Sequence, residues 1–578
     1  MKKMLLTLII LLTACLKQVP DHVKQYDNLT YDYSYTNGLS EFEKRSFYNM
    51  SQGIYYLPYD VIVSMSRPVP NQFKLYDELF LEDPERLGLI PSPYRDTDPP
   101  VGITVSSDPE FVPMAGISCI TCHSSTISNS SRQAFLVDGS GSKFAIDRLI
   151  QEMVTSMALT MTNTIEFNKF FNRYKERAKL AEYPSSQEDF DLLTDTNTYY
   201  QLRSSLKNDN PDVLDQLASF EEQLSLELGG EKVPTTLSYG VYPAKNDLNT
   251  RTKMFLYLSK RLLWFATEAQ YAKTDERLAP TGLGRGAPWG SSINKFAALY
   301  YDKSAEQWPS VPSSAVDTPF IWNYEDAKWV FYTGTTNSMV ERNFAQSIAL
   351  LTDFNSSTFE TTASIKKMEH IQQFTRKFQP PKWPENILGP INQDKATQGK
   401  ELFKIRCLAC HNAKRETYTG PGSIDYNYID VGTDDQYFKG QTQDFYGKEF
   451  IGDILPVLMN QVKVTAAENE GIPNLGSYEI GRTPAIWRQP TKNAIAAKPL
   501  WGVWATAPYL HNGSVLNMRE LLTKPQNRLM AFHVGSIEYD IDNLGFQNKQ
   551  TAYSSLFEAQ CVNCLGNSNQ GHNFSTDL

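Results

Sequence analysis

The spacing of hydrophobic positions predicts helices through much of the middle of the chain, between about residues 145 and 375. In the clearest case the apolar residues recur at steps of four, three and four, which places them on one face of a helix. These residues are Val213, Leu217, Phe220 and Leu224. A second stretch, Thr250 to Lys273, is apolar over much of its circumference, so we expect a largely buried helix.

Proline and glycine separate this helical pattern from the rest of the chain. Residues 16–100 are rich in Tyr, Pro and Asp and show little periodicity, which predicts an irregular N-terminal segment. Ala134 to Val137 has the pattern of a short strand, and a glycine turn and a helical pattern follow it. Gln379 to Asn392 contains four prolines and one glycine, which predicts an extended connector at a domain boundary.

The first fifteen residues have the order of an export signal. Two lysines precede an apolar stretch, Met4 to Leu12, that is too short to span a bilayer. The sequence LTAC that ends at Cys15 resembles the bacterial lipobox, in which the cysteine becomes the acylated N-terminus. We therefore expect cleavage after Ala14 and a lipid anchor on Cys15. An ordinary secretory signal, in which Cys15 has no role, is the alternative.

The composition indicates a folded chain with an acidic surface. The chain has 578 residues, of which 41% are hydrophobic, enough for two or three packed domains. The formal net charge is −10, and Lys and Arg form no clustered run. Phosphate binding needs such clusters, so nucleic acid is not an expected partner. The export signal favours the periplasmic or cell-surface side of a bacterial membrane as the location of the protein.

Apart from Cys15, the cysteines form three C-x-x-C pairs. Two of these pairs are followed at once by histidine, in GISCITCHSS and KIRCLACHNA. The residues are Cys119, Cys122 and His123 in the first motif, and Cys407, Cys410 and His411 in the second. Haem c is held by two thioethers from cysteines one helical turn apart, with the adjacent histidine as proximal iron ligand. A redox C-x-x-C or half of a zinc site would not need histidine after both pairs. We therefore predict two covalently bound haem c groups.

The helical pattern before the second motif supports this prediction. Ala396, Gly399, Leu402 and Phe403 lie at helical spacing. They resemble the first helix of a cytochrome c domain, in which small residues approach another helix and Phe covers the haem edge. The two motifs and the long helical stretch between them are similar to bacterial dihaem cytochrome c peroxidases. KPLWGVWATAPYLHNGSVLNMRELL, with GNSNQGHNFSTDL at the end and VDGSG after the first motif, is closer to the rubber oxygenase branch.

The resemblance implies unequal ligation of the two irons. In the rubber oxygenase branch the second haem has two histidine ligands, the far one from a C-terminal Gly-His motif, which implies His572 as the partner of His411. His511, Met518, Met530 and His533 are the alternatives. Cys561 and Cys564 lack a following histidine, so an oxidising compartment favours a disulfide between them, with free thiols or a degenerate haem site as alternatives.

For the first haem, the relatives imply His123 as the sole permanent ligand and an open distal side. The stretch GLGRGAPWGSSINKF resembles their distal wall and nominates Phe296 as the catalytic-site residue, with Arg285 and Trp289 nearby. Core packing is the simpler explanation for Phe296. His370 is a further candidate for capping this iron. Trp501 and Trp504 are candidates for positions between the haems, although packing is the commoner role of tryptophan.

The expected fold is mainly α, with two cytochrome c-like haem domains, long helical insertions and irregular loops. The expected boundaries are a signal at 1–14, an N-terminal segment at 15–100, the first haem domain at 101–378, a linker at 379–392 and a C-terminal cytochrome c domain at 393–578. The expected function is an exported dihaem oxidoreductase, with one haem open to peroxide or dioxygen and the other transferring electrons from a donor protein. A periplasmic electron-transfer cytochrome without catalysis is the alternative.

Overall fold

The computed structural model describes residues 25–573 with internal gaps. The residues left out are 36, 71, 95–97, 107–111, 179–242, 244–247, 272–276, 302–313, 355–357, 416–421, 483–484, 491–492 and 560–563. The predicted signal and anchor cysteine, the stripe from Val213 to Leu224 and Cys561 lie outside the described residues. Across the described part, no helix has both the length and the apolar character needed to cross a bilayer.

The N-terminal segment, expected to be irregular, contains short regular elements around the first C-x-x-C-H motif. Its helices are α2 (Glu41–Tyr48) and α3 (Tyr59–Ser64). Its strands are β1 (Thr30–Tyr31), β2 (Leu57–Pro58), β3 (Ser66–Pro68) and β4 (Leu75–Leu79), and β5 (Ile103–Val105) follows just after it. β2 and β5 flank β6 (Met114–Ile117) in an antiparallel sheet, and β6 leads directly into α4 (Cys119–Cys122). Short elements without hydrophobic periodicity therefore position the first motif.

A hairpin and a tight turn hold the backbone of this motif from its other side. β7 (Ser124–Ser128) pairs with β8 (Gln133–Asp138), as the strand prediction at 134–137 required, and β1 adds in parallel. The glycine turn after β8 returns to the motif, where the Gly139 amide donates to the His123 carbonyl at 2.7 Å. The Ser142 amide donates to the Cys122 carbonyl at 2.9 Å. The predicted helix then follows as α5 (Ile146–Thr162).

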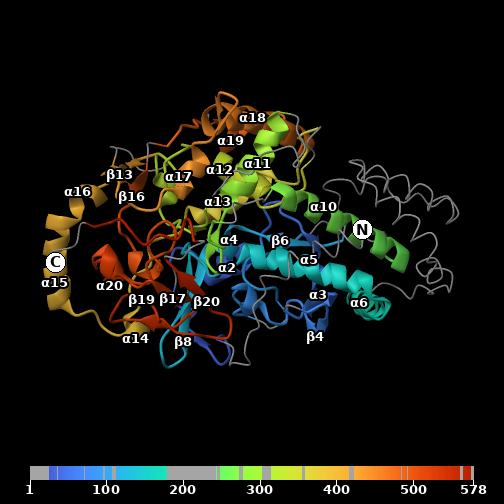
Figure 1. Cartoon of the computed structure of the whole chain (residues 1–578), viewed down its shortest axis with the longest axis horizontal. Coiled ribbons are helices and arrows are strands. Elements are labelled where there is room, and N and C mark those ends of the chain that lie inside the picture. Colours follow the sequence, from blue (N-terminus) through green and yellow to red (C-terminus); the bar gives the residue numbers. More distant parts are fainter. Residues whose placement is uncertain are drawn as a thin grey trace.

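Two helical groups pack beside this region, and Figure 1 shows α5 and α10 extending to one end of the molecule. The first group comprises α5, α6 (Thr164–Arg177) and α10 (Arg251–Tyr271). The second comprises α11 (Pro288–Tyr300), α12 (Met339–Ala349), α13 (Ile365–Thr375) and α18 (Leu455–Asn469). The predicted helix at 250–273 is confirmed as α10, with Met254 and Leu258 fully buried.

Two of the three large hydrophobic cores meet at the first motif. Cys122 packs against the core of the α5, α6 and α10 group, which includes Met153 and Leu258. Cys119 packs against a different core, in which Phe47, Trp322 and Tyr539 join segments from both ends of the chain. The α11, α12 and α18 group forms the third core. The motif therefore lies at a junction between cores.

The connector at 379–392 is less extended than predicted. It contains a helical turn, α14 (Glu385–Leu388), with Ile387 and Leu388 buried. Trp383 donates its indole N–H to the Gly389 carbonyl at 2.8 Å and its ring lies across that of Trp504. The prolines limit helix length here, but apolar residues between them still fasten the segment to the body.

The C-terminal part begins with the predicted helix, α15 (Gln393–Arg406), followed by α16 (Leu408–His411). Figure 1 shows α15 at the edge of the molecule opposite α6. The other helices of this part are α17 (Gln436–Gln441), α19 (Glu479–Arg482) and α20 (Met518–Leu521). Paired short strands complete it: β11 (Lys414–Arg415) with β12 (Ile424–Asp425), β13 (Asn427–Asp430) with β16 (Ala494–Ala497), β14 (Asp444–Phe445) with β15 (Lys448–Glu449), β17 (Ala531–Val534) with β20 (Ser555–Glu558), and β18 (Tyr539–Asp540) with β19 (Gly545–Phe546).

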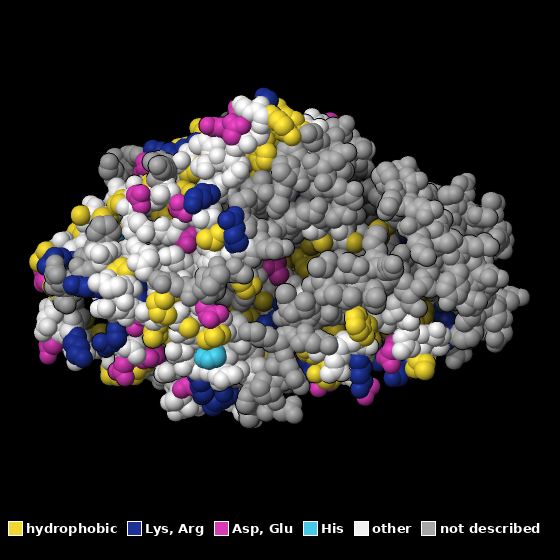
Figure 2. Space-filling model, viewed as in Figure 1, with side chains coloured by type: hydrophobic (Ala, Val, Ile, Leu, Met, Phe, Trp, Pro, Cys, Tyr) yellow, Lys and Arg dark blue, Asp and Glu magenta, His cyan; other side chains and the backbone are white. Residues whose placement is uncertain are grey.

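The fold class is mixed, so the mainly α expectation is only partly met. The chain has 39% helix and 17% strand, with the strands in small sheets. These strands mostly contain two to six residues, too short for a clear alternating pattern in the sequence. On the face drawn in Figure 2, the described acidic and basic side chains are interspersed.

Asp138 supplies a test of this architecture, because its carboxylate is fully buried beside the motif. It accepts from Ser124 at 2.9 Å and Tyr48 at 3.0 Å, and pairs with the buried Lys44 at 3.1 Å. We expect Asp138→Asn to destabilise the fold by about 3–5 kcal/mol, because it leaves a buried ammonium without its counter-charge. Denaturant unfolding measures this change. The control Glu538→Gln removes the half-buried partner of the exposed Lys549 and should cost about 0–1 kcal/mol. Equal effects of the two variants would contradict the interpretation.

Candidate functional site

The first motif presents two free, half-buried thiols. Cys119 and Cys122 form no disulfide. Cys119 Sγ donates to Gln52 Oε1 at 2.9 Å, which ties the motif to the N-terminal segment. Burial raises the pKa of Cys119 to about 11, and burial with the neighbouring Cys119 raises the pKa of Cys122 to about 12. Both sulfurs are therefore neutral thiols and lie one helical turn apart on α4.

His123 ends α4 in a buried, electropositive environment. Its side chain is 6% exposed. Burial lowers the pKa of His123 to about 3, with Arg342 as the next cause, so the ring is neutral and can bind a metal. The Pro319 carbonyl approaches the ring, but Nδ1 makes no full hydrogen bond.

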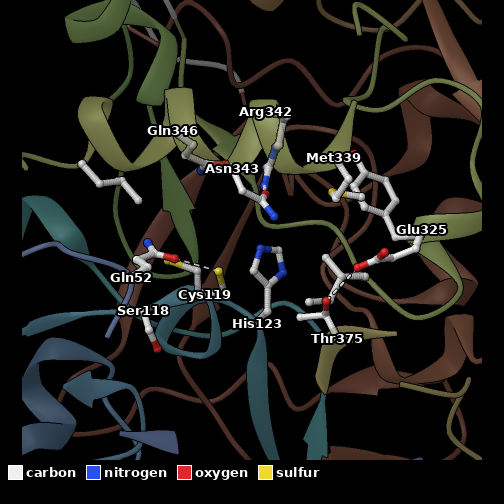
Figure 3. A pocket seen from close by; sticks show the side chains of 14 residues that line it. Gln52, Ser118, Cys119, His123, Glu325, Met339, Arg342, Asn343, Gln346 and Thr375 are labelled. Carbon is white, nitrogen blue, oxygen red and sulfur yellow. Dashed lines mark hydrogen bonds between the residues drawn. The ribbon is translucent and has the colours of Figure 1, made fainter. Parts of the chain in front are cut away.

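Two cavities open beside His123, and both are also lined by Cys122, Tyr324 and Arg342. The smaller, of about 50 Å³, is drawn in Figure 3. It includes Cys119, Gln52 and Met339 in its lining. The larger, of about 340 Å³, extends between α5, α10 and α11. These two cavities leave space for a haem attached to the first motif.

The larger cavity contains the residues nominated for the distal wall. Phe296 lines it from α11 and is 1% exposed, so it is both a cavity residue and a core residue. Arg285, on β9 (Arg285–Gly286), also lines it and faces Asp317 across the pairing with β10 (Val316–Asp317). Burial raises the pKa of Asp317 well above its usual range. The side chain of Trp289 lies outside the description.

Arg342 and Lys498 both act electrostatically on His123, and neither was nominated as a site residue from the sequence. Figure 3 shows Arg342 reaching from α12 toward His123. Its Nε is buried without a hydrogen-bond partner, and Nη1 donates to Asn343 at 2.8 Å. Lys498 is 8% exposed, and burial together with Arg342 lowers its pKa to about 7. Both cations come from segments more than 200 residues beyond the motif, and lone basic residues in such segments have no diagnostic spacing.

The second motif, by contrast, lies near the surface. Cys407 and Cys410 are free thiols, and α15 buries none of its residues. Leu402 is 47% exposed and Ile405 is 74% exposed. A Cβ added at Gly399 would meet nothing within 4 Å, so the expected close approach of another helix is absent among the described residues. Apolar side chains are thus left uncovered beside this motif.

His411 is oriented by a backbone carbonyl. Its Nδ1 lies 2.8 Å from the carbonyl oxygen of Lys498. A carbonyl can only accept, so Nδ1 carries a proton, and Nε2 is the ring nitrogen left to bind a metal. Metal-binding histidines are commonly held in this way by a partner on the other ring nitrogen.

His572 lies opposite His411, with ring centroids 6.4 Å apart and ring planes at 53°. An imidazole nitrogen binds a metal at about 2 Å, and the ring centre lies roughly 1 Å behind that nitrogen. Two rings on opposite sides of one metal therefore have centres about 6 Å apart. Burial, then His411 and Arg528, lowers the pKa of His572 to about 4, which keeps its ring neutral. The pair has the spacing of two axial ligands.

The tail that carries His572 is fixed by its neighbouring glycine and by Arg528. Gly571 has φ +88°, and a Cβ there would lie 2.5 Å from the Thr433 amide nitrogen. The His572 amide donates to the Val431 carbonyl at 2.8 Å. Arg528 donates to the carbonyls of Gly571 at 3.0 Å and His572 at 3.3 Å. The tail thus lies flush against residues 431–433.

The other candidates for axial ligands lie elsewhere. His511 is buried between Tyr332 and Tyr437, with Nδ1 3.4 Å from the Thr433 hydroxyl. Met530 is 45% exposed, and His533 lies on β17. Met518 begins α20. His370 is exposed on α13 against Phe374 and lines neither cavity beside His123.

Trp501, Trp504 and Cys564 are the remaining residues nominated from the sequence. Trp504 donates to the Pro381 carbonyl at 3.1 Å, and Trp501 is 40% exposed. Neither lines the two cavities beside His123. Cys564 is disulfide-bonded, in keeping with the disulfide prediction for this residue, but its partner lies outside the described residues. Among the described residues, no three His, Cys, Asp or Glu side chains converge on a metal position.

Comparison with known proteins supports one part of this arrangement directly. A RoxA-like, cytochrome c-like family model matches residues 494–533. Residues 494–533 form a cytochrome c-like region. This region contains Lys498, whose carbonyl holds His411, and Arg528, which holds the tail. A cytochrome c-like region implies haem c, and the free thiols and the His411–His572 spacing fit that group.

Two curated relatives from Sinorhizobium fredii are similar to more of the chain. The chain is 26% identical to the uncharacterized protein y4iJ over 353 residues. This match covers 52% of this chain and 57% of y4iJ. It is also 26% identical to the uncharacterized protein y4iM over 277 residues. This match covers 44% of this chain and 55% of y4iM. The chain thus matches little more than half the length of each relative.

Gly571→Ala tests whether the missing Cβ positions the tail. The added methyl would collide with the Thr433 backbone at a positive φ, so we expect the tail contact to weaken by about 1–3 kcal/mol. Hydrogen exchange at the His572 amide, measured by mass spectrometry or NMR, should accelerate about tenfold or more. The control Gly399→Ala adds a methyl where nothing lies within 4 Å and should leave that exchange unchanged. Unchanged exchange in both variants would contradict the packing argument.

Proposed function

We propose that the chain is an exported dihaem c-type oxidoreductase with one saturated iron and one accessible iron. The observation that carries the proposal is an asymmetry between two motifs of the same sequence pattern. His411 faces a second imidazole at 6.4 Å, whereas His123 faces a cavity of about 340 Å³. Apart from His123, the residues that line this larger cavity include no histidine and no methionine.

The accessible site would bind peroxide or dioxygen. Haem with an open axial position supplies the redox chemistry for such molecules, while the protein controls access, polarity and orientation. Phe144, Ile150, Phe265 and Phe296 make much of the cavity wall apolar, which keeps water out. Arg285 and Asp317 provide a buried polar pair on the same wall, where a hydrogen bond to a bound oxygen species would form.

The saturated site would transfer electrons. Two histidines, one held by the Lys498 carbonyl and one by the Arg528-bound tail, would hold the group on Cys407 and Cys410 from both sides. Exposed Leu402 and Ile405 lie beside that position, close to where a donor protein would deliver electrons. Fixed ligation changes little between oxidation states, which favours rapid electron transfer.

A non-catalytic electron carrier is the second candidate, and Met339 is the observation that favours it. Met339 lines the smaller cavity beside His123, and methionine is an axial ligand in many cytochromes c. If Met339 binds the first iron, both irons are saturated and no position remains for an oxygen species.

Mass spectrometry of the mature protein tests the cofactor and its location. We expect the added mass of two haems and an N-terminus at acylated Cys15, because haem c is attached outside the cytoplasm. Changing Cys407 and Cys410 together to Ala should remove one haem and leave the other. A mature protein with no haem mass would overturn the proposal, and an unmodified N-terminus would overturn the anchor alone.

Absorption and EPR spectra of His572→Ala test the unequal ligation. In the wild type we expect one low-spin and one high-spin ferric haem, and binding of cyanide or carbon monoxide at the high-spin haem only. His572→Ala should convert the low-spin haem to high spin, because it removes one of its two axial imidazoles.

The control His533→Ala alters a histidine on β17 and should leave both spectra unchanged. Met339→Leu separates the two candidate functions. An unchanged spectrum with this variant supports the open site. A shift of one haem from low to high spin would instead establish methionine ligation and the carrier function.

A further inference from the structure

Lys498 contacts both candidate sites through different parts of one residue. Its carbonyl oxygen lies 2.8 Å from His411 Nδ1, as described for the second site. Its ammonium lies among three aromatic rings, of which those of Tyr324 and Tyr332 line the larger cavity of the first site. Nζ lies 4.8 Å from the ring centre of Phe320, 5.0 Å from that of Tyr324 and 5.4 Å from that of Tyr332.

The ammonium is buried without a compensating carboxylate. Lys498 is 8% exposed, and no acidic side chain of the described residues contributes to its electrostatics. Burying a lone charge is costly, so such cations are normally paired. Ring faces attract a cation and offset part of this cost. They provide no full negative charge, so the charge of Lys498 is not balanced by an ion pair within the described residues.

This charge acts on the first site. Tyr324 and Tyr332 line the larger cavity with His123, and Lys498 acts electrostatically on His123 from behind them. Arg342 adds a second cation inside the cavity, also without a carboxylate at ion-pair distance among the described residues. A nearby positive charge in a poorly solvated site favours the reduced, electron-rich state of a redox group.

We propose that Lys498 is a positioning residue shared by the two haem sites. Its carbonyl fixes the tautomer of His411, and its ammonium raises the reduction potential of the haem attached beside His123. The inference rests on the proposed dihaem function. It gives electron flow a direction, from the His411 site toward the His123 site, because the uncompensated cations lie next to the latter.

Spectroelectrochemical titration of Lys498→Met at pH 6, where the Lys498 side chain is charged, tests the inference. The variant removes the charge, keeps the chain length and retains the carbonyl that holds His411. We expect the equilibrium constant for reducing the high-spin haem to fall about tenfold, which is about 59 mV for one electron. The low-spin haem should keep its spectrum. The control Lys328→Met removes the same charge from an exposed lysine paired with Asp425 and should leave both potentials unchanged.

Lys498→Arg, which keeps the charge, should restore the wild-type potential. If Lys498→Met does not assemble with haem while Lys498→Arg does, the charge is required at this position and the inference stands. If Lys498→Met loads two haems and leaves the high-spin potential unchanged, the inference is overturned while the dihaem function survives. A wild-type protein without two haems would overturn the dihaem function itself. Failure of both variants to assemble would overturn the role of charge.

Discussion

The arrangement of the second site depends on one close contact between backbones, where the C-terminal tail meets residues 431–433. Gly571 permits this contact because a Cβ would lie 2.5 Å from the Thr433 amide nitrogen. The next residue is then turned so that its ring faces His411 at 6.4 Å. Arg528 donates to the carbonyls on both sides of this turn. A histidine more than 150 residues from the motif is thereby held in a fixed position opposite His411.

The same five-residue motif is placed in two contrasting environments. The first copy lies where hydrophobic cores meet, with half-buried thiols and a neutral, buried histidine that faces a cavity. The second lies on an exposed helical segment, with its histidine already opposite another ring. Identical covalent chemistry can therefore serve different purposes, because burial and axial neighbours control what an iron binds and how readily it is reduced.

The sequence predicted the features that depend on local spacing. The strand, glycine turn and helix after the first motif, and the helices α10 and α15, occur where periodicity placed them. The N-terminal segment was predicted less well, because its strands of two to five residues leave no periodic pattern. The site residues contributed from afar were also missed. Gln52, Arg342 and Lys498 carry ordinary polar side chains, and only folding brings them to the motifs. His572 was nominated through family resemblance, since spacing alone did not distinguish it from Met530 or His533.

The bare surface of α15 has a consequence for biogenesis. A helix with no buried residue and with Ile405 74% exposed gains little from the surrounding polypeptide. On the dihaem proposal, the porphyrin itself supplies the missing packing partner, so this segment matures only after the attachment machinery has acted. Chains without bound haem would expose an apolar, loosely packed helix, which quality-control proteases recognise readily. The cell would thus have a built-in means of removing unloaded copies before they reach their working location.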